Sequence, residues 1–178
     1  MKGLIKVAMV AGLMAGAFSL RAWADEGMKM PQKEMPAEFE KLKTLVGTWT
    51  GKSKMHSDKD QNIKVTYELI AGGSAILERL FPGTPEEMVS MYNVENGKVS
   101  MKHYCTMGNA PVMILKKSTD NELSFEMKGK EGLSSEKEMH MHALDITWKD
   151  KDHIAASWTS NNDGKKANCS VFNLTRKM

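Results

Sequence analysis

Two pairs of side chains in this sequence have the chemistry and the spacing to bind a metal ion or to transfer protons. His103 and Cys105 are two residues apart, and so are His140 and His142. On a β-strand, residues two apart point to the same side and lie about 6.5 to 7 Å from each other, so both can reach one cation. If the two strands face each other, four nitrogen and sulfur ligands converge.

Both pairs lie in segments that alternate between apolar and polar residues, as β-strands do. Apolar residues are in phase with each pair, which predicts that all four side chains point into an apolar interior. The in-phase apolar residues are Val99, Met101, Leu144, Ile146 and Trp148.

The predicted interior site admits more than one occupant. Imidazole and thiolate ligands suit a transition metal such as zinc or copper, and imidazole alone suits haem iron. Without a metal, the histidines would hydrogen-bond to neighbouring polar side chains or to buried water. Cys105 would then be a free core thiol, or it would form a disulfide with Cys169, the second of the two cysteines.

The rest of the chain predicts a barrel that would position these residues. Short stretches with a period of two run from Leu45 to Arg176, separated by turn residues. The predicted strands cover 45–52, 63–69, 73–81, 87–94, 97–105, 110–117, 121–129, 138–148, 153–160 and 166–176. About ten consecutive strands joined by tight turns indicate an all-β, antiparallel up-and-down sheet, which closes into a barrel with room for one small ligand.

Two regions precede the barrel. Residues 1–24 combine a basic start, an apolar run and a small-residue cleavage motif, Ala22-Trp23-Ala24, which predicts a signal peptide. The apolar run is shorter than the roughly 20 residues of a membrane-spanning helix, so we expect no stable membrane anchor and an exported protein, periplasmic or extracellular. Residues 25–35 predict a flexible arm, and 36–178 a single domain that opens with one short helix.

Charge and motifs exclude several classes of function. The chain has 25 basic and 22 acidic residues, and Lys2, Lys6 and Arg21 of the predicted signal account for the excess. The remaining chain is balanced, so nucleic acid is not an expected partner. The sequence has no nucleophile elbow, phosphate-binding loop or metalloprotease motif, so an enzyme that uses the histidines and Cys105 stays a third hypothesis.

The two ends of the predicted barrel resemble known families. Gly47-Thr48-Trp49 follows the short helix and resembles the Gly-x-Trp opening of lipocalin and calycin barrels. In those barrels an arginine at the end of the last strand packs across the tryptophan. Arg176 stands in the corresponding place, so the resemblance implies a structural cation–π contact between Trp49 and Arg176 that closes the barrel.

Longer motifs extend the resemblance over most of the chain. They are His103-Tyr104-Cys105-x-x-Gly108-Asn109-x-Pro111, Glu138-Met139-His140-Met141-His142 and Trp158-x-x-x-x-Asp163-Gly164-Lys165. Together they resemble a family of small exported bacterial proteins with lipocalin-like barrels and no established activity. The opening Leu45-Val46-Gly47-Thr48-Trp49 is also similar to that of the nitrobindins, ten-stranded barrels that hold haem through a histidine on a late strand.

Inside such a barrel, the leading hypothesis is a site for a small apolar or amphipathic molecule. Methionines in phase with the strand interiors would supply flexible apolar walls. The candidate ligand-binding residues are Tyr67, Met101, His103, Cys105, His140 and His142. In addition, the alternation over 75–81 requires either Glu78 or Arg79 to point inward, for which we expect an internal salt bridge.

Overall fold

The computed structural model describes residues 34–54 and 60–177. The predicted signal peptide and all but the last two residues of the predicted arm lie outside these ranges, so export remains a prediction. Among the described residues, no helix is long and apolar enough to span a membrane.

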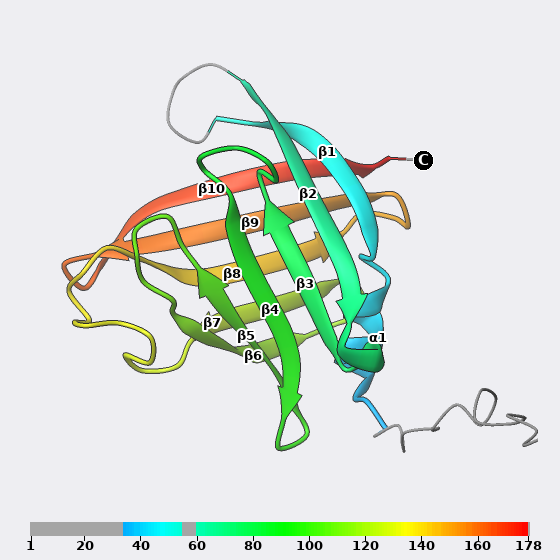
Figure 1. Ribbon diagram of the computed structural model, residues 1–178, viewed down its shortest axis with the longest axis horizontal. Helices are drawn as coiled ribbons and strands as arrows, with labels where there is room; N and C mark the ends of the chain where they lie inside the picture. The colour runs from blue at the N-terminus through cyan, green and yellow to red at the C-terminus, as the bar shows by residue number, and fades with distance from the viewer. Residues whose placement is uncertain (1–33, 55–59, 178) are drawn as a thin grey trace, which may run out of the picture. The chain divides into compact units, whose positions relative to one another are not determined.

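The predicted all-β antiparallel barrel is confirmed (Figure 1). The elements are α1 Ala37–Lys43, β1 Gly47–Ser53, β2 Gln61–Ile70, a 3-10 turn η1 Ala71–Gly73, β3 Ala75–Leu80, β4 Met88–Glu95, β5 Lys98–Tyr104, β6 Val112–Ser118, β7 Glu122–Met127, β8 His140–Trp148, β9 His153–Asn162 and β10 Lys165–Arg176. Each strand pairs with its neighbours in sequence, and β1 also pairs with β10, so the sheet has no free edge.

The register of β4 and β5 follows from a two-residue turn. Asn96 and Gly97 both have positive φ, +50° and +76°, which is the type I′ geometry that matches the twist of a hairpin. The turn places Ser90 directly opposite His103. Cross-strand partners share one face of the sheet, so Ser90 points into the barrel with His103.

Trp49 and Arg176 close the barrel as the resemblance implied. The Trp49 ring is fully buried, and the Arg176 guanidinium carbon lies 4.2 Å from its centroid. The guanidinium also donates hydrogen bonds to the carbonyl oxygens of Val46, at 2.9 Å, and Thr44, at 2.6 Å. A cation over the ring therefore joins the last strand to the segment that leads into the first.

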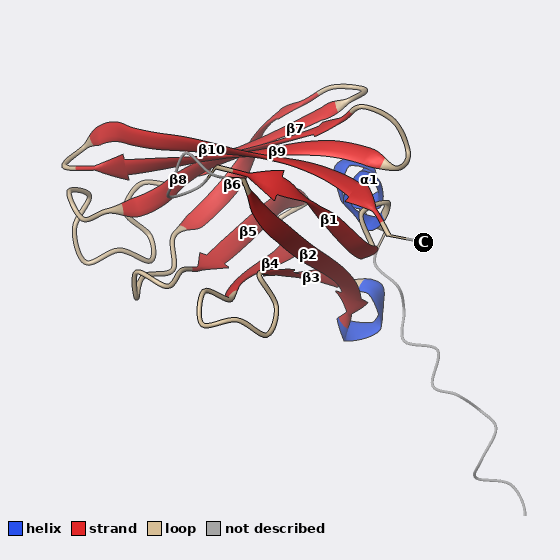
Figure 2. Cartoon of the chain, turned by 90° about the horizontal axis from the view of Figure 1, so that it is seen from above, coloured by secondary structure: helices blue, strands red, loops and turns tan. Residues whose placement is uncertain are grey.

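The two ends of the barrel differ. Helix α1 lies at the end where β1 begins and β10 finishes, and it buries Phe39 and Leu42 against the core (Figures 1 and 2). At the opposite end the loops β5–β6 and β7–β8 and the hairpin β9–β10 come together. In an antiparallel meander the first residues of β4, β8 and β10 all reach this second end, where the pocket described below lies.

Candidate functional site

A buried carboxylate occupies the centre of the barrel wall formed by β2, β3 and β4. Glu78 is 1 % exposed and accepts hydrogen bonds from Tyr67, at 2.8 Å, and Tyr92, at 2.9 Å. Burial raises the pKa of Glu78, and the hydrogen bonds from Tyr67, Ser90 and Tyr92 oppose this rise. The expected internal salt bridge is therefore wrong, because Arg79 points outward and pairs with Glu87 at 2.8 Å.

His103 is joined to this carboxylate through Ser90. Its Nδ1 lies 3.0 Å from the Ser90 hydroxyl oxygen, and its ring is fully buried. The Ser90 hydroxyl oxygen can accept the Nδ1–H of His103, and in that tautomer the lone pair of the ring is on Nε2. Burial lowers the pKa of His103 to about 4, so the ring is neutral at pH 7. Nε2 of His103 then carries a free lone pair.

An apolar, sulfur-lined pocket lies beside His103, at the end of the barrel opposite α1. We refer to this cavity of about 280 Å³ as the inner pocket. Its apolar walls are Leu80, Met88, Met107, Met139, Met141 and Phe172, and Cys105 adds a thiol. Uncharged polar residues complete the lining, namely Thr106, Ser160, Asn168 and Ser170. The expectation that His103 and Cys105 face an apolar interior is thus confirmed.

Two buried nitrogen atoms of the inner pocket have no hydrogen-bond partner among the described residues. They are Nε2 of His103 and Nε1 of Trp158, and both side chains line the cavity. The two ring centroids are 4.7 Å apart. Each buried polar atom without a partner costs about 1–3 kcal/mol, so an occupant that pairs with both would be stabilised. One nitrogen accepts a hydrogen bond and the other donates one.

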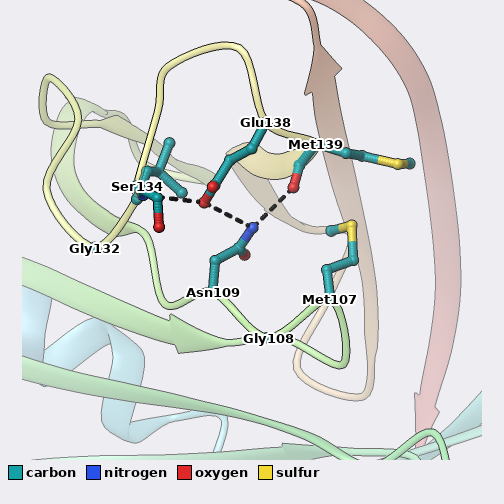
Figure 3. A pocket seen from close by; sticks show the side chains of 8 residues that line it. Met107, Gly108, Asn109, Gly132, Ser134, Glu138 and Met139 are labelled. Atoms are coloured by element: carbon teal, nitrogen blue, oxygen red, sulfur yellow. Dashed lines mark hydrogen bonds between the residues drawn. The ribbon is translucent and has the colours of Figure 1, made fainter.

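The mouth of the barrel is held by Asn109 (Figure 3). Its Nδ2 donates to the Met139 carbonyl, at 2.8 Å, and to the Glu138 carboxylate, at 3.3 Å. These bonds fasten the β5–β6 turn to the end of the β7–β8 loop. Beside them is an outer cleft of about 780 Å³, which shares Met107 and Met139 with the inner pocket. Two flexible thioethers therefore separate the inner pocket from the outer cleft.

The β7–β8 loop also packs closely on the segment before β6. The Ala110 N–H donates to the Gly132 carbonyl, at 3.1 Å, and the Val112 N–H donates to that of Glu131, at 3.1 Å. A Cβ atom at Gly132 would lie 1.9 Å from the Ala110 oxygen, and Gly132 has φ +86°. Only glycine permits this approach of the two backbones.

The prediction that His140 and His142 point into the interior is wrong. Met141 pairs with Ser160 and Ala143 pairs with Thr159, so His142 is the extra residue of a β-bulge. The extra residue shifts the alternation of inward and outward side chains by one for the residues before it. Met139 and Met141 therefore line the inner pocket in place of the two histidines. His140 and His142 line a separate cavity of about 300 Å³, with 3.2 Å between Nε2 of His140 and Nδ1 of His142.

The four predicted metal ligands consequently do not converge, because His103 and Cys105 line a different cavity from the two β8 histidines. In the described part of the chain, no three side chains of the His, Cys, Asp and Glu types are grouped around a position for an ion. The haem implied by the nitrobindin resemblance does not fit either. The β8 histidines do not line the inner pocket, His153 on β9 is exposed, and β10 has no histidine.

The other predicted site residues are placed as follows. Met101 and Tyr67 are buried in the core, and neither lines the inner pocket. The Tyr67 hydroxyl donates a hydrogen bond to Glu78. Of the two alternatives for Cys105, a free thiol or a disulfide with Cys169, the structure has the free thiol, and Cys169 is free as well. Cys169 is exposed on β10, where Ser170 and Phe172 are the residues that line the pocket, so Cys105 and Cys169 lie on opposite sides of the wall.

Sequence reasoning missed three residues of this site, namely Ser90, Tyr92 and Trp158. A signal for the first two was present, because the Asn96-Gly97 turn fixes which residues of 88–94 lie opposite 99–105. Trp158 has no such local signal, since its contact with His103 depends on strands far apart in the barrel.

The titration of His103 is expected to lower the free energy of unfolding by about 3 kcal/mol as the pH is lowered from 6.5 to 4. The unfolded imidazole takes up a proton near its ordinary pKa of 6.5, whereas the buried one does so only near 4. In this window the unfolded state binds more protons, so the free energy of unfolding rises with pH. Urea unfolding at a series of pH values, with a chelator present, measures the slope of the free energy of unfolding against pH.

The matched control is His103→Gln, which keeps a donor for Ser90 and has no titrating group. Glu78 has the opposite pH dependence, because its folded pKa is raised, but it is present in both proteins and cancels in the difference. Identical slopes of the free energy of unfolding against pH for wild type and His103→Gln would show that His103 is not the source of this pH dependence.

Comparisons with known proteins show the fold. Neither a protein-family model nor a curated protein matches this chain. The crystal structure of Rv2717c from M. tuberculosis is similar, with 15% identity, coverage of 82% of this chain and 100% of that one, and a TM-score of 0.55. A protein of unknown function from the DUF3598 family of Nostoc punctiforme shares 11% identity over 76% of this chain and 48% of its own, with a TM-score of 0.44.

Proposed function

We propose that this protein is a binding module whose inner pocket holds a small apolar molecule with one hydroxyl-like group. The observation that supports this is the pair of unpartnered nitrogens, Nε2 of His103 and Nε1 of Trp158, in a cavity whose largest walls are apolar. The other polar residues of the lining are uncharged, namely Thr106, Ser160, Asn168 and Ser170. A hydroxyl both donates and accepts, so one such group can satisfy the two nitrogens together.

The size of the pocket limits the ligand. Its volume of about 280 Å³ is at the lower end of the roughly 300–1,000 Å³ that is usual for ligand sites. A compact molecule with a single ring or a short chain suits this volume. The four methionines of the wall can adjust their side chains to its shape, because the thioether has several rotatable bonds.

Phenol and toluene form the matched pair of probes, since they differ in the hydroxyl group alone. We expect the protein to bind phenol about 5- to 150-fold more tightly, the range that follows from about 1–3 kcal/mol for polar atoms left unpaired by toluene. Titration of protein labelled with ¹³C at its methionine methyl groups measures both affinities. The signals of Met88 and Met141 should shift, and that of Met113, in the core away from the pocket, should not.

Trp158→Phe tests the anchor itself. The variant keeps an aromatic ring but lacks the N–H donor, so the preference for phenol over toluene should fall at least severalfold. Trp148→Phe, at a half-buried indole outside the pocket, should leave the preference unchanged. A wild-type protein that binds both probes equally would contradict the role of the two nitrogens. A protein that binds neither probe would contradict the proposal as a whole and would indicate a pocket filled by ordered water.

A further inference from the structure

Two sulfur atoms lie in contact at the rim of the inner pocket. The Cys105 thiol donates a hydrogen bond to the Met88 thioether, with 3.7 Å between the sulfurs. Cys105 follows the end of β5, and Met88 opens the neighbouring strand β4. Ser90 and His103 are the next residues along these strands on the same face. Cys105, Met88 and His103 therefore present two sulfurs and one unpartnered imidazole nitrogen to one cavity.

We propose that these three side chains form a binding site for a monovalent soft metal ion, Cu(I). The thiolate of Cys105, the thioether of Met88 and Nε2 of His103 are its ligands. Thiolate and thioether ligands select Cu(I) over harder ions, and imidazole also suits copper. The site requires deprotonation of Cys105, whose proton passes to solvent as the metal–sulfur bond forms, and no oxidation or reduction takes place.

The geometry of the sulfur pair suits one shared ion. Two sulfurs 3.7 Å apart can both lie at a metal–sulfur distance of about 2.3 Å, with an angle of about 107° at the ion. This angle is close to the tetrahedral one and is accessible in a distorted three-coordinate site. A third ligand from His103 would complete a trigonal site, and His103 is fully buried with its Nε2 unpartnered among the described residues.

The surroundings of His103 are those of a metal-binding histidine. Metal-ligating histidines commonly donate their other N–H to a carboxylate or to a group that holds it, which fixes the tautomer and orients the ring. Here Nδ1 lies 3.0 Å from the Ser90 hydroxyl oxygen, which can accept its N–H. In this tautomer the lone pair of Nε2 is available for an ion.

Charge favours a monovalent ion. A Cu(I) ion and one thiolate sum to zero, so the loaded site places no net charge in a cavity lined by apolar and uncharged polar side chains. A divalent ion with the same three ligands would leave a buried positive charge, which is costly without a partner. The same ligands should therefore discriminate against Zn(II).

This inference goes beyond the proposed function and is separable from it. Both occupants use Nε2 of His103, so Cu(I) and phenol should compete. Met88 and Cys105 are ligands of the copper and make no hydrogen bond to phenol, whereas the preference for phenol over toluene requires the N–H of Trp158. The variants of those residues distinguish failure of one proposal from failure of the other.

The test is an anaerobic competition between the reduced full-length protein and the coloured Cu(I)–bicinchoninate complex. Wild type should remove one equivalent of Cu(I). Ser90→Ala, which removes the group that orients His103, should weaken binding about 10-fold. Cys105→Ser and Met88→Leu each remove a ligand. Their loss of Cu(I) affinity should be greater than about 100-fold, the upper end of the effect of removing an orienting group.

Matched controls are available in the same chain. Cys169→Ser removes the exposed cysteine, and Met113→Leu removes a core methionine outside the pocket; both variants should bind Cu(I) as wild type does. Wild-type affinity in both Cys105→Ser and Met88→Leu would overturn the site and would place the copper on other sulfurs. X-ray absorption at the copper edge of the loaded wild type gives a result that needs no variant, because a spectrum without both sulfur and nitrogen neighbours would also overturn it.

Discussion

Replacing Trp49 by alanine is expected to lower the free energy of unfolding by about 3–5 kcal/mol, the range for deletion of a large buried aromatic side chain. The Trp49 ring is fully buried, and its Nε1 donates to the Leu45 carbonyl at 2.7 Å. The substitution leaves a cavity at the seam between β1 and β10, and it removes the surface on which Arg176 packs. Urea unfolding followed by far-UV circular dichroism measures the loss.

Trp148→Ala is the matched control for this prediction. The Trp148 indole is only partly buried, has Lys41 above its ring at 4.7 Å and donates to the Thr44 hydroxyl at 3.2 Å. Deleting it should cost about 1 kcal/mol, since less surface is buried and water can fill the space. Equal losses for Trp49→Ala and Trp148→Ala would show that closure at the seam is not what makes Trp49 important.

Glu78→Leu is expected to destabilise the protein by about 2–6 kcal/mol. The carboxylate accepts hydrogen bonds from the buried hydroxyls of Tyr67 and Tyr92, and each hydroxyl left without an acceptor costs about 1–3 kcal/mol. The loss therefore comes from the stranded donors and not from a missing ion pair. Urea unfolding at pH 7 measures this change as well.

A triple variant separates this explanation from a simple packing defect. When Tyr67→Phe and Tyr92→Phe are added to Glu78→Leu, all partners become apolar, and most of the lost stability should return. This cycle is required because the three side chains contact one another and their effects are not additive. If the triple variant is less stable than Glu78→Leu alone, the hydrogen bonds are not the source of the effect.

The buried network connects stability with the proposed binding site. Ser90 connects the two parts of the network: it lowers the pKa of the Glu78 carboxyl, and its hydroxyl oxygen lies 3.0 Å from Nδ1 of His103. Loss of Glu78 allows the Ser90 hydroxyl to donate to His103 instead, which moves the ring proton to Nε2. Glu78→Leu should therefore weaken Cu(I) binding in addition to its effect on folding.

Local patterns in the sequence were sufficient for the architecture and for part of the site. The period-two alternation and the turn residues predicted the ten-stranded barrel and the short helix, because both depend on neighbours along the chain. The same alternation correctly placed His103 and Cys105 inside. The Trp49–Arg176 contact followed from a resemblance at the two ends of the barrel.

Tertiary structure alone decided which of these side chains meet. One extra residue at His142 reverses the sides of the residues before it, and such a bulge depends on pairing with β9 and not on the local sequence. The choice between Glu78 and Arg79, and the partners of Glu78, depend on the register of three strands. Alternation along a strand shows which side chains share a face, whereas contacts between strands depend on how the sheet closes.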